Sequence, residues 1–360
     1  MVDMLPDRVR KGRGAVSNQA GRYEPQARVA VDDGWEMPAE DELPPLRTHV
    51  ARDASRTIIS RNESPDIPFD QPINPYRGCE HGCVYCYARP THAYLGLSPG
   101  LDFETRLFAK PDAAKLLAGE LRNPGYRPMA IALGTNTDPY QPVEREYGIT
   151  RQVLETLRDF GHPFSIVTKS ALVLRDLDII GPMAARNLAH VFVSVTTLDR
   201  DLARAMEPRA STPGRRLDAI RGLAAAGVKV GVMAAPMIPA LNDAELEAIL
   251  EAARDAGATS AGYTLLRLPL ELKQIFDEWL LEHAPFKRKH VLSLIRDMRG
   301  GALNHAEFGK RFTGEGAYAQ MVSRRFYAAR ARLGLERNDW SLDLSQFRPP
   351  PQAGDQLGLF

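Results

Sequence analysis

The chain contains 360 residues, of which 44% are hydrophobic and 25% charged, and its formal net charge is +1. This composition excludes wholesale disorder, and the length fits one α/β barrel of about 200 to 250 residues with appendages. No apolar run approaches the roughly 18 residues that a membrane span needs, and the first residues contain no hydrophobic signal segment. We therefore expect a cytoplasmic protein that has no membrane partner.

The first 65 residues are rich in arginine, glycine, proline and acidic side chains. They show no sustained hydrophobic period of either 2 or 3.6, which predicts that residues 1–65 form a largely irregular N-terminal arm. Within this arm, residues 31–43 contain six acidic side chains and no basic one.

From residue 66 to residue 285, continuous apolar runs alternate with amphipathic segments, as in parallel strands that are covered by helices on both faces. The candidate strands are 71–76, 129–134, 164–168, 191–195, 228–233 and 261–266, and the candidate helices are 149–160, 215–227 and 243–257. About six such units are too few to close an eight-stranded barrel. The predicted fold is therefore α/β, a partial (β/α)6 TIM-like barrel, whose chemistry lies on the loops at the carboxyl ends of the strands.

The rest of the chain is predicted to be a basic helical extension over residues 286–345, followed by a spacer and a terminal peptide over 346–360. Residues 286–332 contain eleven Lys or Arg against three acidic side chains. Three consecutive prolines at 349–351 predict a stiff spacer.

All three cysteines of the chain lie in the stretch GCEHGCVYC, with the spacing C-x3-C-x2-C. An odd number of clustered cysteines does not form a disulfide framework and indicates metal or cluster ligation by Cys79, Cys83 and Cys86. Three thiolates can hold three corners of a 4Fe-4S cluster and leave the fourth iron open to a small ligand. The alternative is a zinc site that adds His81 or His92 to the three cysteines.

This spacing, with Tyr85 before the last cysteine, resembles the radical S-adenosylmethionine (radical SAM) superfamily. The resemblance implies that SAM binds the open iron through its amine and carboxylate, and that electron transfer from the cluster cleaves SAM to a 5′-deoxyadenosyl radical. It also implies a reductant such as flavodoxin or ferredoxin.

The stretches CVYCYARPTH and GTNTDPYQPVE (134–144) resemble the spore-photoproduct-lyase-like branch, often labelled DNA repair photolyase, over residues 66–285. The resemblance implies that SAM is contacted by Tyr85, Thr135, Thr137, Lys169, Ser194 and Pro236, and that Tyr87 and Asp138 act on the cofactor or substrate. Other readings remain open: Lys169 as a solvated cation, Asp138 as a turn residue and Tyr85 as a packed ring. In APMIPALND (235–243), Asn242 or Asp243 is expected to cap the following helix.

The chain departs from spore photoproduct lyase because it has no fourth cysteine to return hydrogen to a repaired thymine. We therefore do not expect thymine-dimer reversal by that route, although the tyrosines Tyr85 and Tyr87 on either side of Cys86 have counterparts in that branch.

The basic extension interleaves cations with aromatic rings, a composition that is expected of nucleic-acid contact surfaces. The residues are Lys287, Arg288, Lys289, Arg324 and Arg325, with Phe308, Phe312, Phe326 and Tyr327. The alternative is an amphipathic helical domain whose rings face its own core. We expect a radical SAM enzyme that acts on a nucleic acid lesion or base; the alternatives are a protein or small-molecule substrate, or a zinc-stabilised nucleic-acid-binding adaptor without catalysis.

The terminal peptide QLGLF, Gln356 to Phe360, resembles the peptide by which bacterial repair and replication proteins dock on the β sliding clamp. Gln356 supplies an amide for hydrogen bonds, and Leu357, Leu359 and Phe360 can fill an apolar groove. A β sliding clamp is therefore an expected partner, and a tail that packs on its own domain is the alternative.

Overall fold

A computed structural model of the chain describes residues 8–26, 45–67, 69–335 and 340–351. The acidic stretch 31–43 and the QLGLF peptide lie outside the described residues. Within them, no helix is both long enough and apolar enough to cross a membrane.

The centre of the molecule is a sheet of six parallel strands in the order β2-β5-β6-β7-β8-β9. The strands are β2 (Gln71–Ile73), β5 (Ile131–Leu133), β6 (Phe164–Thr168), β7 (Ala189–Ser194), β8 (Lys229–Met237) and β9 (Ser260–Leu265). The order follows the chain, so each unit adds one strand beside the previous one, which confirms the partial barrel.

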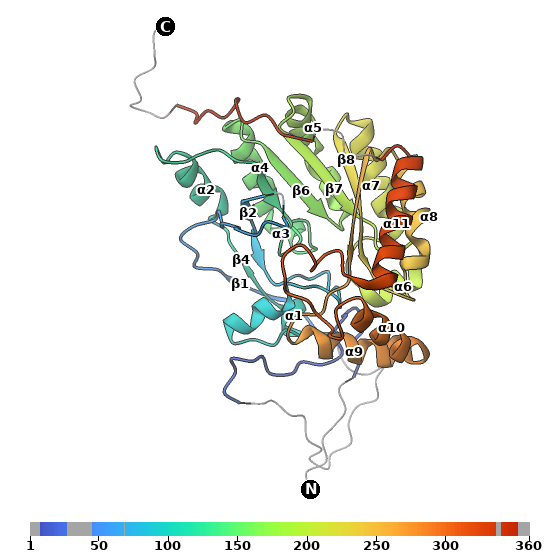
Figure 1. Cartoon of the computed structure of the whole chain (residues 1–360). Coiled ribbons are helices and arrows are strands. Elements are labelled where there is room, and N and C mark those ends of the chain that lie inside the picture. The colour runs from blue at the N-terminus through green and yellow to red at the C-terminus, as the bar shows by residue number, and fades with distance from the viewer. Residues whose placement is uncertain (1–7, 27–44, 68, 336–339, 352–360) are drawn as a thin grey trace.

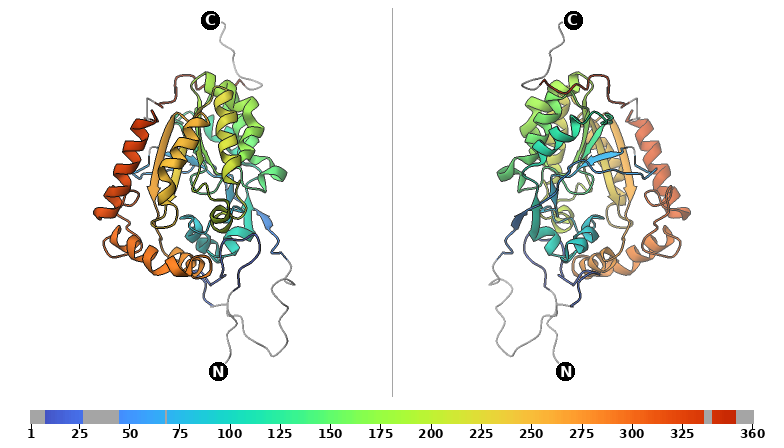
Figure 2. Two further views of the ribbon diagram at one scale, coloured as in Figure 1. Left: turned by 90° about the vertical axis from the view of Figure 1, so that its right-hand side faces the viewer. Right: turned by 90° about the vertical axis from the view of Figure 1, so that its left-hand side faces the viewer.

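Helices cover the outer side of this sheet, as the two side views show (Figure 2). They are α2 (Ala113–Leu121), α4 (Ile149–Asp159), α5 (Leu177–Ala185), α7 (Pro213–Ala225), α8 (Leu246–Asp255) and α11 (Gly316–Arg332). Short helical segments lie among the loops: η2 (Arg89–Leu95), α1 (Asp102–Thr105), α3 (Glu144–Tyr147), η3 (Ala171–Asp176), α6 (Arg200–Met206) and η4 (Asp243–Glu245). Valines and isoleucines of the central strands, such as Ile166, Val191 and Val230, are fully buried, as strands covered on both faces require.

The predicted first strand differs from the observed one. The chain leaves the six-stranded sheet after Ile73 and joins a separate small sheet through β3 (Tyr76–Arg77), which pairs antiparallel with β4 (Arg106–Ala109). Pro75 between them has no N–H to donate to a ladder. The side-chain oxygen of Asn74 instead accepts the backbone N–H groups of Asn136 and Thr137, at 3.0 and 3.2 Å.

The small sheet also contains a strand from the N-terminal arm. β1 (His49–Arg52) pairs parallel with β4, so this part of the arm is regular. Residues 45–67 therefore take part in the structure around the cysteine loop.

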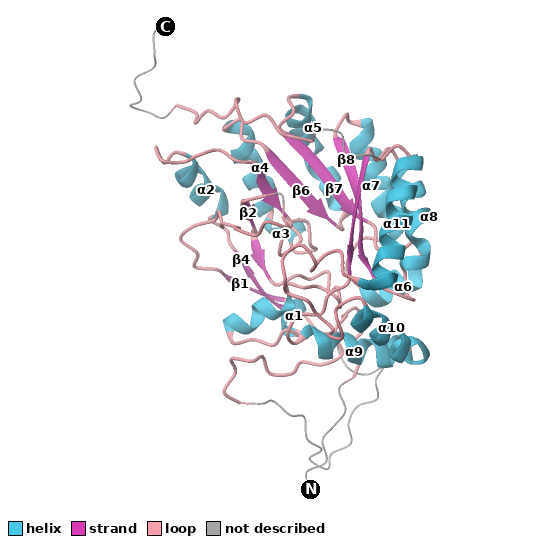
Figure 3. Ribbon diagram, viewed as in Figure 1, coloured by secondary structure: helices cyan, strands magenta, loops and turns pink. Residues whose placement is uncertain are grey.

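The strands point toward one end of the molecule, where α9 (Leu272–His283) and α10 (Pro285–Asp297) lie with α1 (Figure 1). Loops gather between these helices and the strand ends (Figure 3). The C-terminal stretch runs along the opposite end: Arg348 N donates to Phe160 O at 2.9 Å, and Arg122 Nη1 donates to Pro350 O at 2.7 Å.

Candidate active site

The cysteine loop is fixed by its backbone. Cys79 N donates to Phe103 O at 2.9 Å, and Val84 N donates to Met206 O at 3.0 Å. Gly82 has φ 68°, and a Cβ there would lie 2.7 Å from a carboxylate oxygen of Glu104, so only glycine fits. In this loop Cys79 and Cys83 are buried and Cys86 is half-buried.

A buried ion pair, Arg89–Glu104, supports the loop from behind. The two side chains lie 2.5 Å apart and both have no solvent exposure. Arg89 also donates to the carbonyl groups of Gly82, at 2.9 Å, and Cys83, at 2.8 Å. The planar guanidinium therefore joins the peptide units of the cysteine loop to one fixed carboxylate.

The N-terminal arm closes the other side of Glu104. Gly14 N and Ala15 N donate to the two carboxylate oxygens of Glu104, at 2.9 and 2.8 Å. A Cβ on Gly14 would lie 1.9 Å from Gly82 O, so the arm touches the cysteine loop through a glycine. Residues 13–15 are consequently part of the support of the loop.

Gln141 ties the loop to the segment that follows β5. Its Oε1 accepts from Glu80 N at 2.8 Å, and its Nε2 donates to Gly78 O at 3.2 Å. Gln141 is fully buried, so these two hydrogen bonds take the place of the hydrogen bonds that its amide would make with water.

The thiols are held in a state that disfavours free thiolate. Burial raises the pKa of Cys79, and Asp138 and the neighbouring thiols raise it further. Burial also raises the pKa of Cys83, against the opposing effect of Lys169. Thiolate is the form that ligates a metal or cluster, so binding of such a group would displace these protons.

In the described ranges, no group of three or more His, Cys, Asp or Glu side chains is placed to hold one metal ion. His92 Nε2 lies 2.9 Å from Arg106 O, and His81 Nδ1 lies 3.4 Å from Asp138 Oδ2, so each faces a partner other than a thiol. A cubane cluster has different requirements, because each thiolate binds a separate iron at its own corner.

Asp138 lies at the centre of the strand ends. Its Oδ1 accepts from Thr168 Oγ1 at 2.7 Å and its Oδ2 accepts from Lys169 N at 2.7 Å. Burial would raise its pKa, but His81 and these donors outweigh burial and hold the pKa of Asp138 at about 2. Asp138 also accepts from Tyr140 N, which is the contact expected of a turn residue. The same carboxylate therefore stabilises the turn and carries a buried charge.

Tyr85 of the cysteine loop lies near the neighbouring ends of β6 and β7, where Lys169 and Ser194 are found. The Lys169 ammonium lies 5.7 Å from the centre of the Tyr85 ring. The Tyr85 hydroxyl lies 3.2 Å from Thr196 Oγ1 in a buried contact just beyond Ser194, the last residue of β7. Ser194 is buried, and its carbonyl accepts from Arg216 Nη1 at 3.2 Å.

Tyr87, Thr135 and Thr137 form another part of the same end. The Tyr87 hydroxyl donates to Thr135 O, while 46% of the residue stays exposed. Loss of hydration around this hydroxyl and the nearby Cys86 raise the pKa of Tyr87 to about 12. Thr137 is buried and donates to Tyr76 O at 3.0 Å, so its hydroxyl already has a protein acceptor.

Pro236 lies in the irregular end of β8, where the pairing with β9 shifts between Ala234 and Met237. Asn242 shapes this turn: its amide donates to Thr196 O at 2.7 Å and to Pro236 O at 3.0 Å, and its oxygen accepts from Ile238 N at 2.6 Å. Asn242 is the N-cap residue of the following helical segment, η4, as predicted. Asn242 makes no side-chain capping bond to η4, and Asp243 accepts from the Tyr318 hydroxyl instead.

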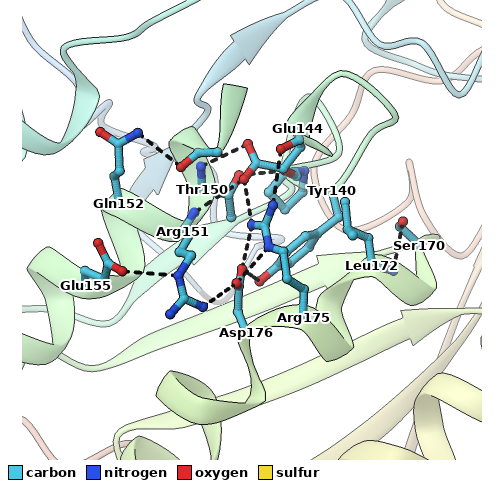
Figure 4. A network of polar contacts seen from close by, with 12 residues as sticks. Tyr140, Glu144, Thr150, Arg151, Gln152, Glu155, Ser170, Leu172, Arg175 and Asp176 are labelled. Atoms are coloured by element: carbon cyan, nitrogen blue, oxygen red, sulfur yellow. Dashed lines mark hydrogen bonds and ion pairs between the residues drawn. The ribbon is translucent and has the colours of Figure 1, made fainter. Parts of the chain in front are cut away.

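The carboxylate of Glu144 faces away from the loop that carries Thr135 and Asp138. It lies in a buried network, where it accepts from Thr150 N at 3.0 Å and pairs with Arg175 at 2.8 Å (Figure 4). Tyr140 donates to Asp176 in the same network, so these polar groups anchor the loop 134–144 from below.

The basic extension supplies fewer free groups than its composition suggested. Phe326 is buried, with 2% exposure, and cannot reach a ligand. Arg288 pairs with Asp277 and Arg325 pairs with Glu247. Phe308 and Tyr327 are exposed, as predicted for ligand contacts.

The sequence analysis did not identify Arg89, Glu104, Gln141 and Arg267. Arg89 and Gln141 lie inside the stretches quoted for the resemblance, which was the available signal. Glu104 and Arg267 come from segments that carry no motif, and only their contacts in the fold mark them.

Three comparisons place the chain among known proteins. A family model described as "Radical SAM superfamily" matches residues 73–253. An uncharacterised protein of Mycobacterium tuberculosis, Rv2578c, is 41% identical over 221 residues, which are 61% of this chain and 65% of that protein. The chain thus spans about two thirds of the length of this mycobacterial relative. An uncharacterised protein of Acidianus two-tailed virus, ORF301, is 30% identical over 66% of this chain and 75% of its own length.

The fold is similar to that of spore photoproduct lyase. One structure of that enzyme, complexed with dinucleoside spore photoproduct, covers 79% of this chain and 78% of its own, with a TM-score of 0.55 and 16% identity. A variant with bound AdoMet and dinucleoside spore photoproduct gives the same TM-score of 0.55 at 15% identity.

Proposed function

Because this chain belongs to the radical SAM superfamily, we propose that it is an enzyme whose cysteine loop holds a 4Fe-4S cluster and that it cleaves SAM. The single observation that carries this proposal is the buried, preformed loop with its three thiols and no fourth cysteine. When bound, the cluster supplies an electron to SAM and yields a 5′-deoxyadenosyl radical, which abstracts hydrogen from a substrate.

The chain's own residues have separate tasks in this proposal. Cys79, Cys83 and Cys86 ligate three irons, and burial around them excludes water and oxidants. Arg89, Glu104 and Gln141 are positioning residues that keep the backbone of the loop in place.

The SAM-binding groups are those at the ends of β5 to β8. Lys169 offers a cation to the SAM carboxylate in a charge-assisted contact. Tyr85 and Pro236 flank the adenosyl group, and Ser194, Thr135 and Thr137 line the strand ends around it. Lys169 lies against the Tyr85 ring, which supports a shared ligand for these two residues.

Two residues are proposed to act nearest the chemistry. Asp138, ionised at neutral pH, holds His81 and the Lys169 backbone in fixed orientation beside Cys79. Tyr87 keeps its phenolic proton because its pKa is about 12, as a hydrogen donor to a substrate radical must. Its position directly after Cys86 supports this role.

The proposed substrate is a nucleic acid lesion or base. The support is the spore photoproduct lyase fold, whose structures hold a dinucleoside lesion, together with the excess of positive charge in residues 286–332. We further propose a flavodoxin or ferredoxin as reductant. The QLGLF peptide remains a prediction for a β sliding clamp, tested by fluorescence polarisation with Leu359→Ala and Phe360→Ala in the intact chain.

Metal analysis after anaerobic reconstitution tests the cofactor. We expect about four irons and four sulfides per chain, no zinc, and an electron paramagnetic resonance signal of the reduced cluster that changes when SAM is added. One zinc per chain with no labile sulfide is the result that contradicts the proposal.

A further inference from the structure

Three aromatic rings and two guanidinium groups alternate in a row that starts beside the cysteine loop. Arg267 lies 5.0 Å from the Tyr87 ring and 5.2 Å from the Phe312 ring. Arg311 lies 4.8 Å from the Phe312 ring and 4.9 Å from the Phe308 ring. We call this row, Tyr87–Arg267–Phe312–Arg311–Phe308, the cation–aromatic ladder.

Arg267 is the member of the ladder that lacks an anion. It lies two residues beyond the carboxyl end of β9, the edge to which the cysteine loop also belongs. In the described part of the chain its guanidinium contacts two ring faces and makes no hydrogen bond or ion pair. Burial lowers the pKa of Arg267 against the opposing effects of Tyr87 and Asp66, and a bound anion would stabilise this buried charge.

Arg311, by contrast, is already paired. Its Nε lies 2.6 Å from Asp66 Oδ2, so its charge is balanced within the protein. Counting only partners among the described residues, the ladder has one guanidinium without an anion, at its inner end next to Tyr87.

The outer part of the ladder is held rigidly. Arg299 is buried and donates to Arg311 O at 2.7 Å and to Leu266 O at 2.9 Å. Leu265 N donates to Phe312 O at 2.9 Å. The segment between α10 and α11 that carries Phe308 and Phe312 is thereby fastened to the end of β9 and extends from α11 toward the middle of the molecule (Figure 1).

The two ends of the ladder present open rings. Phe308 is 56% exposed and Tyr87 is 46% exposed, whereas the Phe312 ring is contacted by a guanidinium on each side. Two exposed rings in one row with the Arg267 guanidinium match a ligand that carries both flat bases and phosphate groups.

We propose that the cation–aromatic ladder binds one unpaired strand of nucleic acid, with a phosphate on Arg267 and bases stacked on Tyr87 and Phe308. The inference rests on the nucleic acid substrate proposed above and specifies how that substrate reaches the site. The strand enters over Phe308 and is led inward to Tyr87, which follows Cys86. Residues 286–332 contain eleven basic against three acidic side chains, and four of the basic ones, Arg288, Arg311, Arg325 and Arg332, pair with carboxylates outside this segment. The positive charge that remains favours a polyanion.

The test measures binding of two fluorescein-labelled probes to the reconstituted full chain by anisotropy. One probe is a thymidine dodecamer and the other is an abasic dodecamer of the same charge. Arg267→Gln is compared with Arg254→Gln, which removes the same charge from α8, where Arg254 is exposed and contacts no ring of the ladder. Phe308→Leu is compared with Phe286→Leu, which removes a fully exposed ring from α10.

We expect Arg267→Gln to weaken binding of both probes about tenfold, the factor that corresponds to about 1.4 kcal/mol. Arg254→Gln should change both by less than about threefold, as a distant surface charge does. Phe308→Leu should weaken the thymidine probe by about fivefold or more and leave the abasic probe unchanged, because stacking needs a base. Phe286→Leu should leave both unchanged.

Equal losses for Arg267→Gln and Arg254→Gln, or equal losses of both probes in Phe308→Leu, overturn the ladder. If Arg267→Gln lowers the thermal midpoint, Arg267→Lys decides, since it keeps the charge and should recover most of the binding of the abasic probe. SAM cleavage measured without any oligonucleotide separates the two proposals. If the chain cleaves SAM but the ladder variants bind the probes as the native chain does, only the ladder is contradicted. If the ladder variants lose binding but the native chain does not cleave SAM, only the radical chemistry is contradicted.

Discussion

At the scale of single residues, the candidate site depends on buried charges that have partners. The side chains of Arg89 and Glu104 have no solvent exposure. Arg89 donates to the backbone of the cysteine loop, and Glu104 accepts from the backbone of the N-terminal arm. Removing one partner of such a pair leaves an uncompensated buried charge, which costs about 3 to 5 kcal/mol. The pair therefore links the stability of the fold to the geometry of the cluster ligands.

Glu104→Gln should lower both the unfolding free energy and the iron content after reconstitution. The expected loss of stability is about 3 kcal/mol, because Arg89 remains buried without its carboxylate. Arg221→Gln is the control, since it breaks the exposed Arg221–Asp218 pair and should cost about 1 kcal/mol or less. Denaturant unfolding and iron analysis check both variants, and full iron content in a stable Glu104→Gln chain would remove the positioning role.

Lys169→Met should weaken SAM binding while leaving the cluster intact. A hydrogen bond to a charged group contributes about 1.5 to 3 kcal/mol, so the dissociation constant should rise about 10-fold to 100-fold. Lys115→Met, on the exposed side of α2, is the matched control. The measurement is equilibrium binding of SAM to the reconstituted chains. An unchanged dissociation constant in Lys169→Met would show that Lys169 is a solvated cation that does not contact SAM.

At the scale of elements, the C-terminal stretch is packed onto the amino end of the barrel. The Phe347 ring lies 5.3 Å from the ring of His162 and 5.5 Å from that of Tyr126. The Tyr126 hydroxyl lies 2.7 Å from His162 Nε2, so this neutral histidine joins β6, the loop before β5 and the C-terminal stretch. Burial lowers the pKa of His162 to about 4.

This histidine should make stability depend on pH. Its pKa is lower in the folded chain than the value of about 6.5 that it has when unfolded, so protonation favours unfolding. The stability is fully present above pH 6.5 and is lost as the pH falls toward 4, up to about 3 kcal/mol. His162→Gln should flatten the decline of the unfolding free energy between pH 6.5 and 4, and the exposed His290→Gln should not. Identical pH profiles for both variants contradict the assignment.

The strands and long helices of the barrel could be predicted from the sequence because each carries its own periodicity. β6 was predicted over the residues that form it, Phe164–Thr168, and α4 differs from its prediction by one residue at its end. β1 and β3 could not be predicted from the sequence, because strands of four and two residues are too short to show a hydrophobic period. They form only because β4 lies between them. The cysteines were evident from spacing, whereas Arg89 and Glu104 gain their meaning from partners distant in sequence.

At the scale of the whole molecule, three regions of the chain meet at one end of the sheet. The N-terminal arm supports the cysteine loop through Glu104, the strand ends supply Asp138 and Lys169, and the segment before α11 brings the ladder to Tyr87. This arrangement accounts for a radical SAM core with appendages at both ends of the chain that contribute to a single site.

The central claim is that this chain cleaves SAM with a cluster held by its three cysteines. The direct measurement is chromatography for 5′-deoxyadenosine after dithionite reduction of the anaerobically reconstituted chain in the presence of SAM. We predict 5′-deoxyadenosine from the native chain and none above background from a variant with Cys79, Cys83 and Cys86 changed to Ala. Equal amounts from both chains, or none from a native chain that carries its full iron and sulfide, would contradict it.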